Sequence, residues 1–194
     1  MTKRPVMMIM TAVAMLAVPD IFAAEKVFEQ RVKDLEQSGV ATKIVNIDAE
    51  NGDAAKGYSF YPKKFAEKCL SIDAAKGCQS KASIKLVRSP VNCVLILSAI
   101  MVKSGEMYIL ELNCMKKGES APVLALRWLA NSGYVDELDF KASITGKNGA
   151  WLYKAVIFEV PDNVQRLHIM LAAGEQPDPE DICWFDNISV YKLQ

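Results

Sequence analysis

Residues 151–171 read WLYKAVIFEVPDNVQRLHIML, and this stretch contains two β-strand patterns. We interpret residues 151–160 and residues 166–172 as period-two segments, and in the second of them Arg166 and His168 alternate with Leu167 and Ile169. A period of two is typical of a strand that buries one face, because successive side chains point to opposite sides. The sequence VPDN, residues 160–163, has the proline and polar residues of a turn. The stretch therefore predicts two half-buried strands with a turn between them.

The same period of two recurs on both sides of this stretch. It is found in SIKLV (83–87), MYILELNCM (107–115), VLALRWL (123–129) and WFDNISVYKL (184–193). Turn-like breaks separate these segments, and helical periodicity does not return after residue 40. The pattern predicts an all-β sandwich or barrel over residues 44–194.

Helical periodicity is confined to the region before residue 40. Phe28, Val32 and Leu35 are spaced by four and three residues, and Gly39 follows them as a stop signal. We therefore expect a short amphipathic helix within residues 25–43, ahead of the β-domain.

The first 24 residues have the order of a secretory signal peptide. Lys3 and Arg4 precede the uncharged run Pro5–Val18, and small residues follow at Ala23 and Ala24. The run is shorter than the ~20 residues that a membrane-spanning helix needs. We expect cleavage near Ala24, a secreted or periplasmic product, and no stable membrane insertion after signal removal. An uncleaved membrane anchor is the alternative.

Charge and composition exclude several classes of function. The chain has 23 Lys and Arg against 23 Asp and Glu, so it lacks the excess positive charge that attracts a phosphate backbone, and we expect no nucleic-acid partner. His168 is the only histidine, which excludes zinc sites that need two imidazoles. The nucleophile-elbow motif GxSxG is absent, and no phosphate-cradling glycine-rich loop precedes a helix. We expect no catalytic residues.

Five cysteines follow the expected signal peptide, namely Cys69, Cys78, Cys93, Cys114 and Cys183. An oxidising compartment permits disulfides, but the sequence does not fix which cysteines pair. Cys69 and Cys78 are the closest in sequence and flank the turn-like DAAKG, so we favour a disulfide between them. Buried cysteines that act as small hydrophobic residues are the alternative.

Six segments occur in a characteristic order between residues 44 and 193. They are DAENGDAAKGYSF (48–60), GCQSKASIKLV (77–87), IMVKSGEMYILELNC (100–114), VLALRWLANSG (123–133), VIFEVPDNVQRLHIML (156–171) preceded by Trp151, and CWFDNISVYKL (183–193). Their order resembles the galactose-binding-like jelly rolls, particularly the carbohydrate-binding modules attached to bacterial xylanases and cellulases. The resemblance implies an antiparallel jelly-roll β-sandwich that binds carbohydrate.

The resemblance also implies a structural calcium ion, held by Glu50 near the start of the domain and Asp186 in the closing strand. Hard oxygen ligands from the two ends of the chain suit calcium. The alternative is a solvated Glu50 and an Asp186 that is bonded to nearby backbone amides.

A carbohydrate site needs polar groups that bond hydroxyls and aromatic faces that stack on sugar rings. Alternation places Glu111 and Asn113 on one face of their strand, and it places Arg127 and His168 on the faces of theirs opposite the apolar residues. We expect these four side chains to line one polar surface. Trp151, beside a glycine-rich turn, is the candidate for stacking. A second face that is only solvated is the alternative.

Together these features predict an exported, non-catalytic β-sandwich module that binds a poly- or oligosaccharide. A binding module usually accompanies a catalytic domain, so a separate enzyme or envelope protein is the expected partner. The alternative is a structural or protein–protein interaction module of the cell envelope without glycan affinity.

Overall fold

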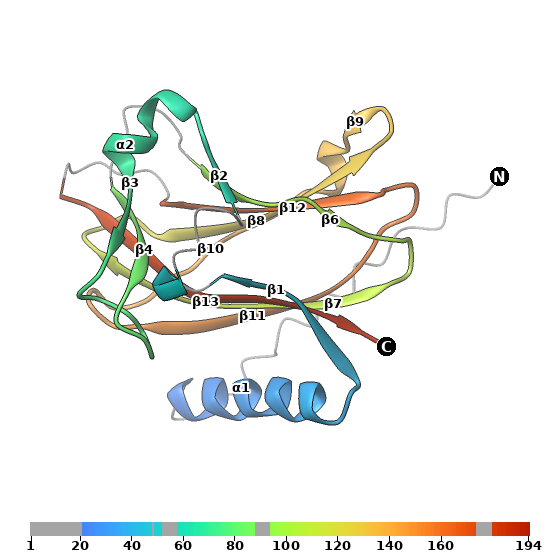
Figure 1. The fold of residues 1–194 in the computed structure, drawn as a ribbon, viewed down its shortest axis with the longest axis horizontal. Helices are drawn as coiled ribbons and strands as arrows, with labels where there is room; N and C mark the ends of the chain where they lie inside the picture. The colour runs from blue at the N-terminus through green and yellow to red at the C-terminus, as the bar shows by residue number, and fades with distance from the viewer. Residues whose placement is uncertain (1–20, 48, 52–57, 88–93, 174–179) are drawn as a thin grey trace.

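A computed structural model describes residues 21–47, 49–51, 58–87, 94–173 and 180–194 of the chain. Within these residues two β-sheets lie face to face, and one long helix lies against the outside of one of them (Figure 1). Every strand pair is antiparallel. The predicted antiparallel β-sandwich is confirmed.

The six-stranded sheet has the order β11-β7-β13-β4-β3, and β1 also pairs with β13. Its strands are β1 (Ala41–Ile47), β3 (Leu70–Asp73), β4 (Ser83–Val87), β7 (Met107–Lys117), β11 (Leu152–Glu159) and β13 (Ile182–Leu193). The first strand begins at Ala41, so it includes the last residues of the segment expected to precede the β-domain.

The seven-stranded sheet has the order β10-β8-β12-β5-β2, with β6 on β12 and β9 on β8. Its strands are β2 (Tyr58–Tyr61), β5 (Val94–Leu97), β6 (Ile100–Met101), β8 (Pro122–Ala130), β9 (Gly133–Tyr134), β10 (Phe140–Ser143) and β12 (Arg166–Ala173). The two strands expected within residues 151–171 are β11 and β12, and they belong to different sheets. The turn between them therefore carries the chain from one layer to the other.

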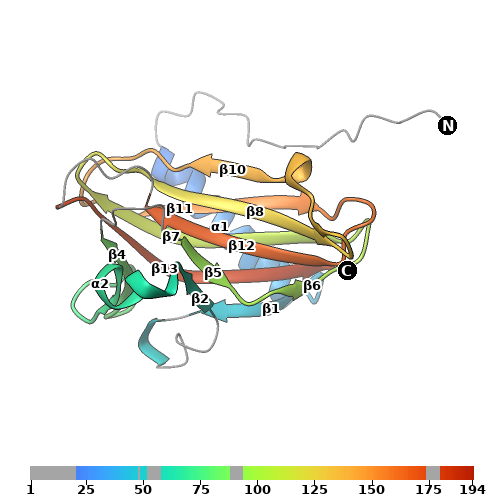
Figure 2. The same cartoon turned by 90° about the horizontal axis from the view of Figure 1, so that it is seen from above.

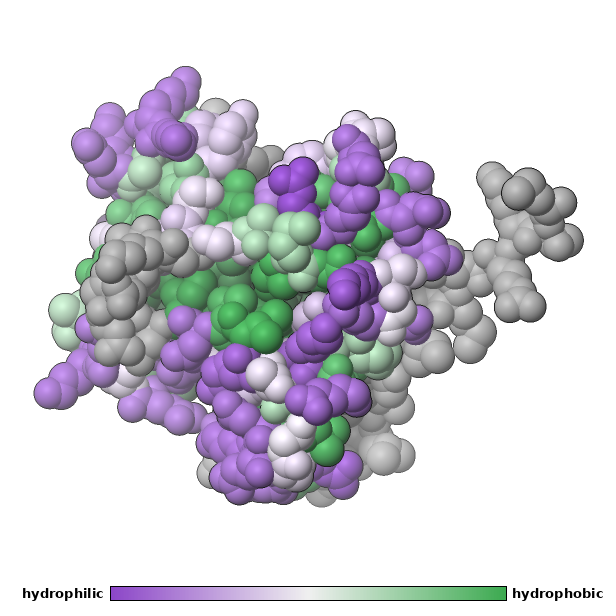
Figure 3. Space-filling model, turned by 45° about the vertical axis from the view of Figure 1, so that its right-hand side comes forward, coloured by the Kyte–Doolittle hydropathy of each residue, from purple (hydrophilic) through white to green (hydrophobic). Residues whose placement is uncertain are grey.

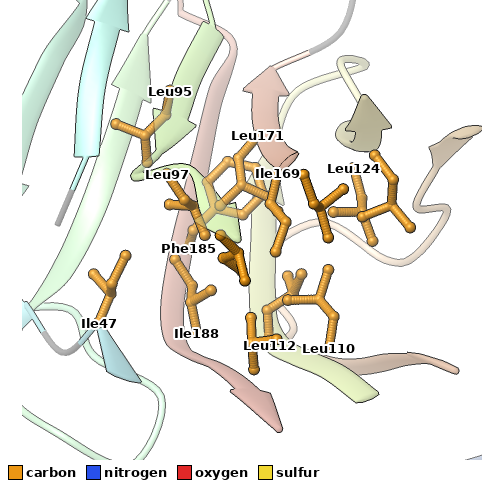
Figure 4. Packing of buried hydrophobic residues seen from close by; sticks show 14 of the residues in the cluster. Ile47, Leu95, Leu97, Leu110, Leu112, Leu124, Ile169, Leu171, Phe185 and Ile188 are labelled. Atoms are coloured by element: carbon orange, nitrogen blue, oxygen red, sulfur yellow. The ribbon is translucent and has the colours of Figure 1, made fainter. Parts of the chain in front are cut away.

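The core is the space between the two sheets. Large apolar side chains from both layers point toward one another there (Figure 4), among them Leu95, Leu97, Leu110, Leu112, Leu124, Ile169, Leu171, Phe185 and Ile188. Figure 3 shows hydrophobic residues concentrated in the middle of the view, with hydrophilic residues around them. Burying a side chain of this size stabilises the fold by about 1.5–3 kcal/mol. Interior packing of alternate residues is therefore what holds the two sheets together.

Strand β13 is central to the six-stranded sheet, because it pairs with β1, β4 and β7. Its alternation changes phase at a β-bulge, where the pairing with β7 shifts between Asp186 and Ser189. Asn187 has a φ of 49° at this point, which is the left-handed region that asparagine tolerates better than most residues. As a result Phe185 and Ile188, three residues apart, both face the core.

Helix α1 (Ile21–Gln37) packs on the outer face of the six-stranded sheet (Figure 1). Val32 is buried there against Ile109 and Tyr191, and Phe28 and Leu35 pack beside it. These are the apolar positions that the spacing of four and three predicts. Gly39 follows the helix with a φ of 77°, as a glycine after a helix C-terminus commonly does.

Four short helical segments complete the described structure, namely η1 (Ala49–Asn51), η3 (Lys63–Phe65), α2 (Ala66–Cys69) and η4 (Asp136–Leu138). In Figure 1 the α2 segment and the β9 hairpin project from the seven-stranded side at its two ends. Most of the expected signal peptide, residues 1–20, lies outside the described residues, and α1 begins at Ile21. Among the described residues, no helix is long and apolar enough to cross a membrane.

The disulfide favoured between Cys69 and Cys78 is not present in the structure. Cys69 is buried in the core at the end of α2, whereas Cys78 lies beyond strand β3 and its backbone N–H is bonded to Asp186. Burial, together with the charges of Asp186 and Glu29, raises the pKa of the Cys78 thiol to about 11. The reactive thiolate is therefore scarce at neutral pH. Cys93 lies outside the described residues.

The packing of α1 generates a prediction about stability. Val32→Ala should lower the free energy of unfolding by about 1.5–3 kcal/mol, because it removes two buried methyl groups and leaves a cavity. Val27→Ala is the matched control, since Val27 lies on the same helix and is 56% exposed; it should change stability by less than about 0.5 kcal/mol. Urea unfolding of both variants measures the difference. Equal effects would mean that α1 does not dock on the sheet.

Candidate functional site

On the outer face of the six-stranded sheet, Glu111 is bonded to side chains of the neighbouring strands. The carboxylate of Glu111 accepts hydrogen bonds from the hydroxyls of Tyr153 (2.7 Å) and Tyr191 (2.8 Å). Burial raises the pKa of both tyrosines, and the charge of Glu111 adds to this. The ring of Phe28 on α1 lies 6.4 Å from that of Tyr153. Glu111 therefore joins the sheet beneath α1 instead of facing a ligand.

Asn113 and Trp151 lie on the same sheet as Glu111. Asn113 is buried in β7, between its neighbours Tyr153 on β11 and Asp186 on β13. Trp151 is half-buried and directly precedes β11, the edge strand. The expectation that Glu111 and Asn113 line the same surface as Arg127 and His168 is wrong, because β7 belongs to the six-stranded sheet and β8 and β12 belong to the other. Alternation identifies the faces of a strand, but it does not tell to which of the two sheets the strand belongs.

Arg127 and His168 do lie together, on the outer face of the seven-stranded sheet. They are directly opposite each other on the neighbouring strands β8 and β12. Residues that are paired in this way in an antiparallel sheet share one face, with Cβ atoms about 5 Å apart. Figure 2 looks onto this sheet from above and shows α1 behind it, on the far side of the molecule. No described helix covers the centre of this face in that view.

Tyr134 completes the cluster around these two residues, and the sequence patterns had not singled it out. Its hydroxyl is 2.8 Å from Nδ1 of His168, and the guanidinium of Arg127 lies 4.1 Å above its ring. Arg127 also donates to Asp136, the first residue of η4, and to Asp139 (2.6 Å), the residue after η4. The guanidinium is therefore held in one orientation by an aromatic face and two carboxylates.

His168 is a neutral side chain in this setting. Burial lowers the pKa of its imidazole, and the positive charges of Arg166 and Arg127 lower it further. A neutral imidazole has one donor and one acceptor nitrogen. Because Nδ1 is bonded to Tyr134, the opposite nitrogen Nε2 is the one left to a ligand hydroxyl.

Next to the cluster the face is lined by smaller apolar side chains. Ala125 on β8, Met170 on β12 and Ile96 on β5 form one cross-strand row, and all three are half-buried. Val94 and Ala172 form part of the next row. These side chains carry no charge and are only partly exposed. The polar cluster thus adjoins an apolar floor.

Tyr61 stands at the other end of this floor, in the row of Val94, and is 63% exposed. Tyr134, which is 43% exposed, lies at the opposite corner, beside Leu129. Four strand spacings and six residues along a strand separate the two tyrosines, which places them about 25–30 Å apart. Both are aromatic residues at a strand end beside turn residues, in FYP and NSGY. That position is the sequence signal that could have identified them.

Asp186 and Glu50 both bind one loop, residues 78–81. Asp186 is buried and accepts hydrogen bonds from the N–H of Cys78 (2.8 Å), the hydroxyl of Ser80 (3.0 Å) and the N–H of Asn187 (2.9 Å). Glu50 is exposed, and its carboxylate accepts from the N–H of Lys81. The two carboxylates therefore connect the start and the end of the domain through this loop.

These contacts do not fit a calcium ion as they are arranged. Calcium binds six to eight oxygen ligands, whereas the carboxylate oxygens of Asp186 already accept from N–H and O–H donors. Among the described residues, no group of three or more His, Cys, Asp or Glu side chains is placed to hold a metal. Asp186 bonded to backbone amides is the alternative that the sequence had left open. Calcium at Glu50 and Asp186 stays a prediction from the resemblance.

Solved structures with the same fold support the jelly-roll architecture. The chain is similar to the CBM22-2 xylan-binding domain of Xyn10C from Paenibacillus barcinonensis, with a TM-score of 0.58 and 15% identity over 77% of this chain and 99% of that domain. It is also similar to the K3 cleaved adhesin domain of Lys-gingipain from Porphyromonas gingivalis, with a TM-score of 0.53 and 12% identity over 77% of this chain and 99% of that domain.

A third likeness is to the enzymatically active domain of tailspike protein 4 from bacteriophage CBA120 (TM-score 0.57, 13% identity), where 77% of this chain corresponds to only 21% of that chain. This protein thus spans about a fifth of that domain. No protein-family model matches the sequence, and neither does any curated protein. At these identities the likeness concerns the fold, and at that level the resemblance to carbohydrate-binding modules is confirmed.

The buried Asp186 generates a second prediction. Asp186→Ala should lower the free energy of unfolding by about 2–4 kcal/mol in the presence of chelator, because three donors lose a charged acceptor. Glu50→Ala should cost less than about 1 kcal/mol, since Glu50 is exposed to solvent. Denaturant unfolding with chelator, and then with added calcium, checks both. A loss at Asp186 that is seen only with calcium would assign its role to an ion.

Proposed function

We propose that this chain is an exported, non-catalytic β-sandwich module that binds a poly- or oligosaccharide on the outer face of its seven-stranded sheet. One observation carries the proposal: two exposed tyrosines, an apolar floor and an oriented polar cluster share that face. The likeness in fold to a xylan-binding domain is consistent with it. Export is proposed from the amino-terminal sequence alone.

The chemistry of the face matches that of a sugar. A pyranose ring has apolar C–H faces, which pack on aromatic rings such as Tyr61 and Tyr134. Its hydroxyls both donate and accept, as do the neutral imidazole of His168 and the hydroxyl of Tyr134. Arg127 is kept rigid by its carboxylate partners, so little side-chain entropy is lost when a ligand binds beside it.

The separation of the tyrosines favours a chain over a single sugar. At about 25–30 Å apart, the two rings are too distant for one pyranose to contact both. A poly- or oligosaccharide that crosses the face diagonally, from Tyr61 to Tyr134, contacts both rings and passes over the floor between them. Such a site recognises the interior of a chain and is independent of its ends.

The proposed role is binding without chemistry. The carboxylates nearest the face, Asp136 and Asp139, are both engaged by Arg127. Glycoside hydrolysis in most families uses two carboxyl groups that flank the scissile bond and contact it. We therefore place any reaction on the bound glycan in a separate enzyme, which is the partner expected for a binding module.

A second candidate function is a structural or protein–protein interaction module of the cell envelope. The likeness to a domain named as an adhesin favours it. A protein partner would occupy the same exposed tyrosines, because aromatic residues also anchor protein interfaces. The two functions differ in whether the purified domain retains a glycan on its own.

A glycan array with the purified domain, followed by calorimetry with the retained polysaccharide, tests the proposal. Tyr61→Ala and Tyr134→Ala should each weaken binding about tenfold, through loss of ring stacking. Ile157→Ala is the control, because Ile157 is comparably exposed at 39% but lies on the other sheet, and it should bind normally. Retention of no glycan by folded protein would contradict carbohydrate binding and favour the interaction module.

A further inference from the structure

The strands of the seven-stranded sheet carry basic residues and no acidic ones. Among the described residues its seven strands contain Arg127, Lys141, Arg166 and His168, and neither Asp nor Glu. The six-stranded sheet has both signs, with Asp73, Glu111, Glu159 and Asp186 among its residues. The whole chain has equal numbers of acidic and basic residues. The segregation is therefore a property of this sheet.

All four basic side chains are on the outer face of the sheet. Arg127 and His168 oppose each other, Lys141 opposes Ala125, and Arg166 opposes Leu129. These partners alternate with the core residues Leu124, Leu126 and Trp128 on β8, which fixes the face on which they lie. The strands thus place basic and no acidic side chains on the proposed glycan surface, and the carboxylates beside it, Asp136 and Asp139, are paired with Arg127.

Two of the four basic residues are available to a ligand as charges. Arg127 is paired with two carboxylates, Asp136 and Asp139, so this cluster offers no net positive charge, and burial and the neighbouring arginines lower the pKa of His168. Lys141 and Arg166 are exposed, and within the described part of the chain neither forms an ion pair. Their charge is left for an external partner.

The charges of Lys141 and Arg166 lie on opposite sides of the path proposed for the glycan. Lys141 lies on β10, and Arg166 lies two strands away on β12 and four residues further along, so their Cα atoms are about 16 Å apart. The diagonal from Tyr61 to Tyr134 runs between them. A chain on this diagonal would therefore have one cation on each side.

We propose that the glycan bound on this face is anionic, with carboxylate or sulfate groups that pair with Lys141 and Arg166. This rests on the proposed carbohydrate binding and adds the class of sugar. The long side chains reach groups that project sideways from the chain, while the tyrosines stack on its rings. Complementary charge also favours this ligand over neutral glycans during encounter.

Matched polymers test the charge. Polygalacturonate should bind more tightly than the same polymer after its carboxyl groups are reduced to alcohols, or dextran sulfate more tightly than dextran. A difference within the first pair would identify carboxylate as the recognised group, and a difference within the second pair would identify sulfate. Binding of the charged polymer should weaken as salt is raised from 0.05 M to about 0.5 M, because screening shortens the range of exposed charges. Calorimetry or affinity electrophoresis measures all four polymers.

Matched variants locate the charges. Arg166→Gln and Lys141→Gln should each weaken binding of the charged polymer about twofold to fivefold, as is usual for an exposed ion pair, and should leave neutral-glycan binding unchanged. Arg31→Gln is the control, because Arg31 is an exposed arginine on α1, across the molecule (Figure 2). It should have no effect on either polymer.

The outcomes separate this inference from the proposed function. Equal or tighter binding of neutral glycans would overturn the anionic ligand and leave carbohydrate binding intact. No binding of any glycan on the array would overturn both. Equal retention of polyglutamate, a polyanion without sugar rings, would also overturn the inference, because the face would then bind charge alone. A loss with Arg31→Gln as large as with Arg166→Gln would move the charged site elsewhere.

Discussion

The burial of alternate side chains between two sheets is the constraint on which the rest of this molecule depends. Each strand of a sandwich gives one face to the core, and its other face must then be covered or solvated. Here the two outer faces differ in how far they are covered. Helix α1 packs on the six-stranded sheet through Val32 and its neighbours, whereas the seven-stranded sheet keeps Tyr61 and Tyr134 exposed. The outer face of the seven-stranded sheet is therefore the one left open to a ligand.

The same division accounts for the charges. The carboxylate of Glu111 accepts hydrogen bonds from two tyrosine hydroxyls beneath α1. It therefore links strands of the six-stranded sheet. Asp186 has a similar role, because its carboxylate accepts hydrogen bonds from the loop at residues 78–81. On the other sheet the acidic residues near the surface, Asp136 and Asp139, orient Arg127. These four carboxylates thus accept hydrogen bonds from groups of the protein itself.

Period-two patterns were sufficient to predict the strands and the sandwich, because alternation records which side chains enter a core. They also placed Arg127 and His168 on the correct face of adjacent strands. They could not tell that the strand of Glu111 belongs to the other sheet, since strand order depends on contacts between residues far apart in the chain. Tyr134 was missed because it lies in a two-residue strand, too short to show any period. Cys69 and Cys78 are near in sequence, but strand β3 follows Cys69 directly, and the backbone of Cys78 is bonded to Asp186.

The central position of β13 has a consequence for the order in which the molecule forms. This strand (Ile182–Leu193) follows β1, β4 and β7 in the sequence, and it joins all three in one sheet. Until it is synthesised, β1 lacks its strand partner and the outer surface on which α1 rests is incomplete. Pairings between distant segments form late and slowly. A chain in which β13 has not yet docked therefore leaves the six-stranded sheet open, and the docking of this one strand joins β1, β4 and β7 into one layer.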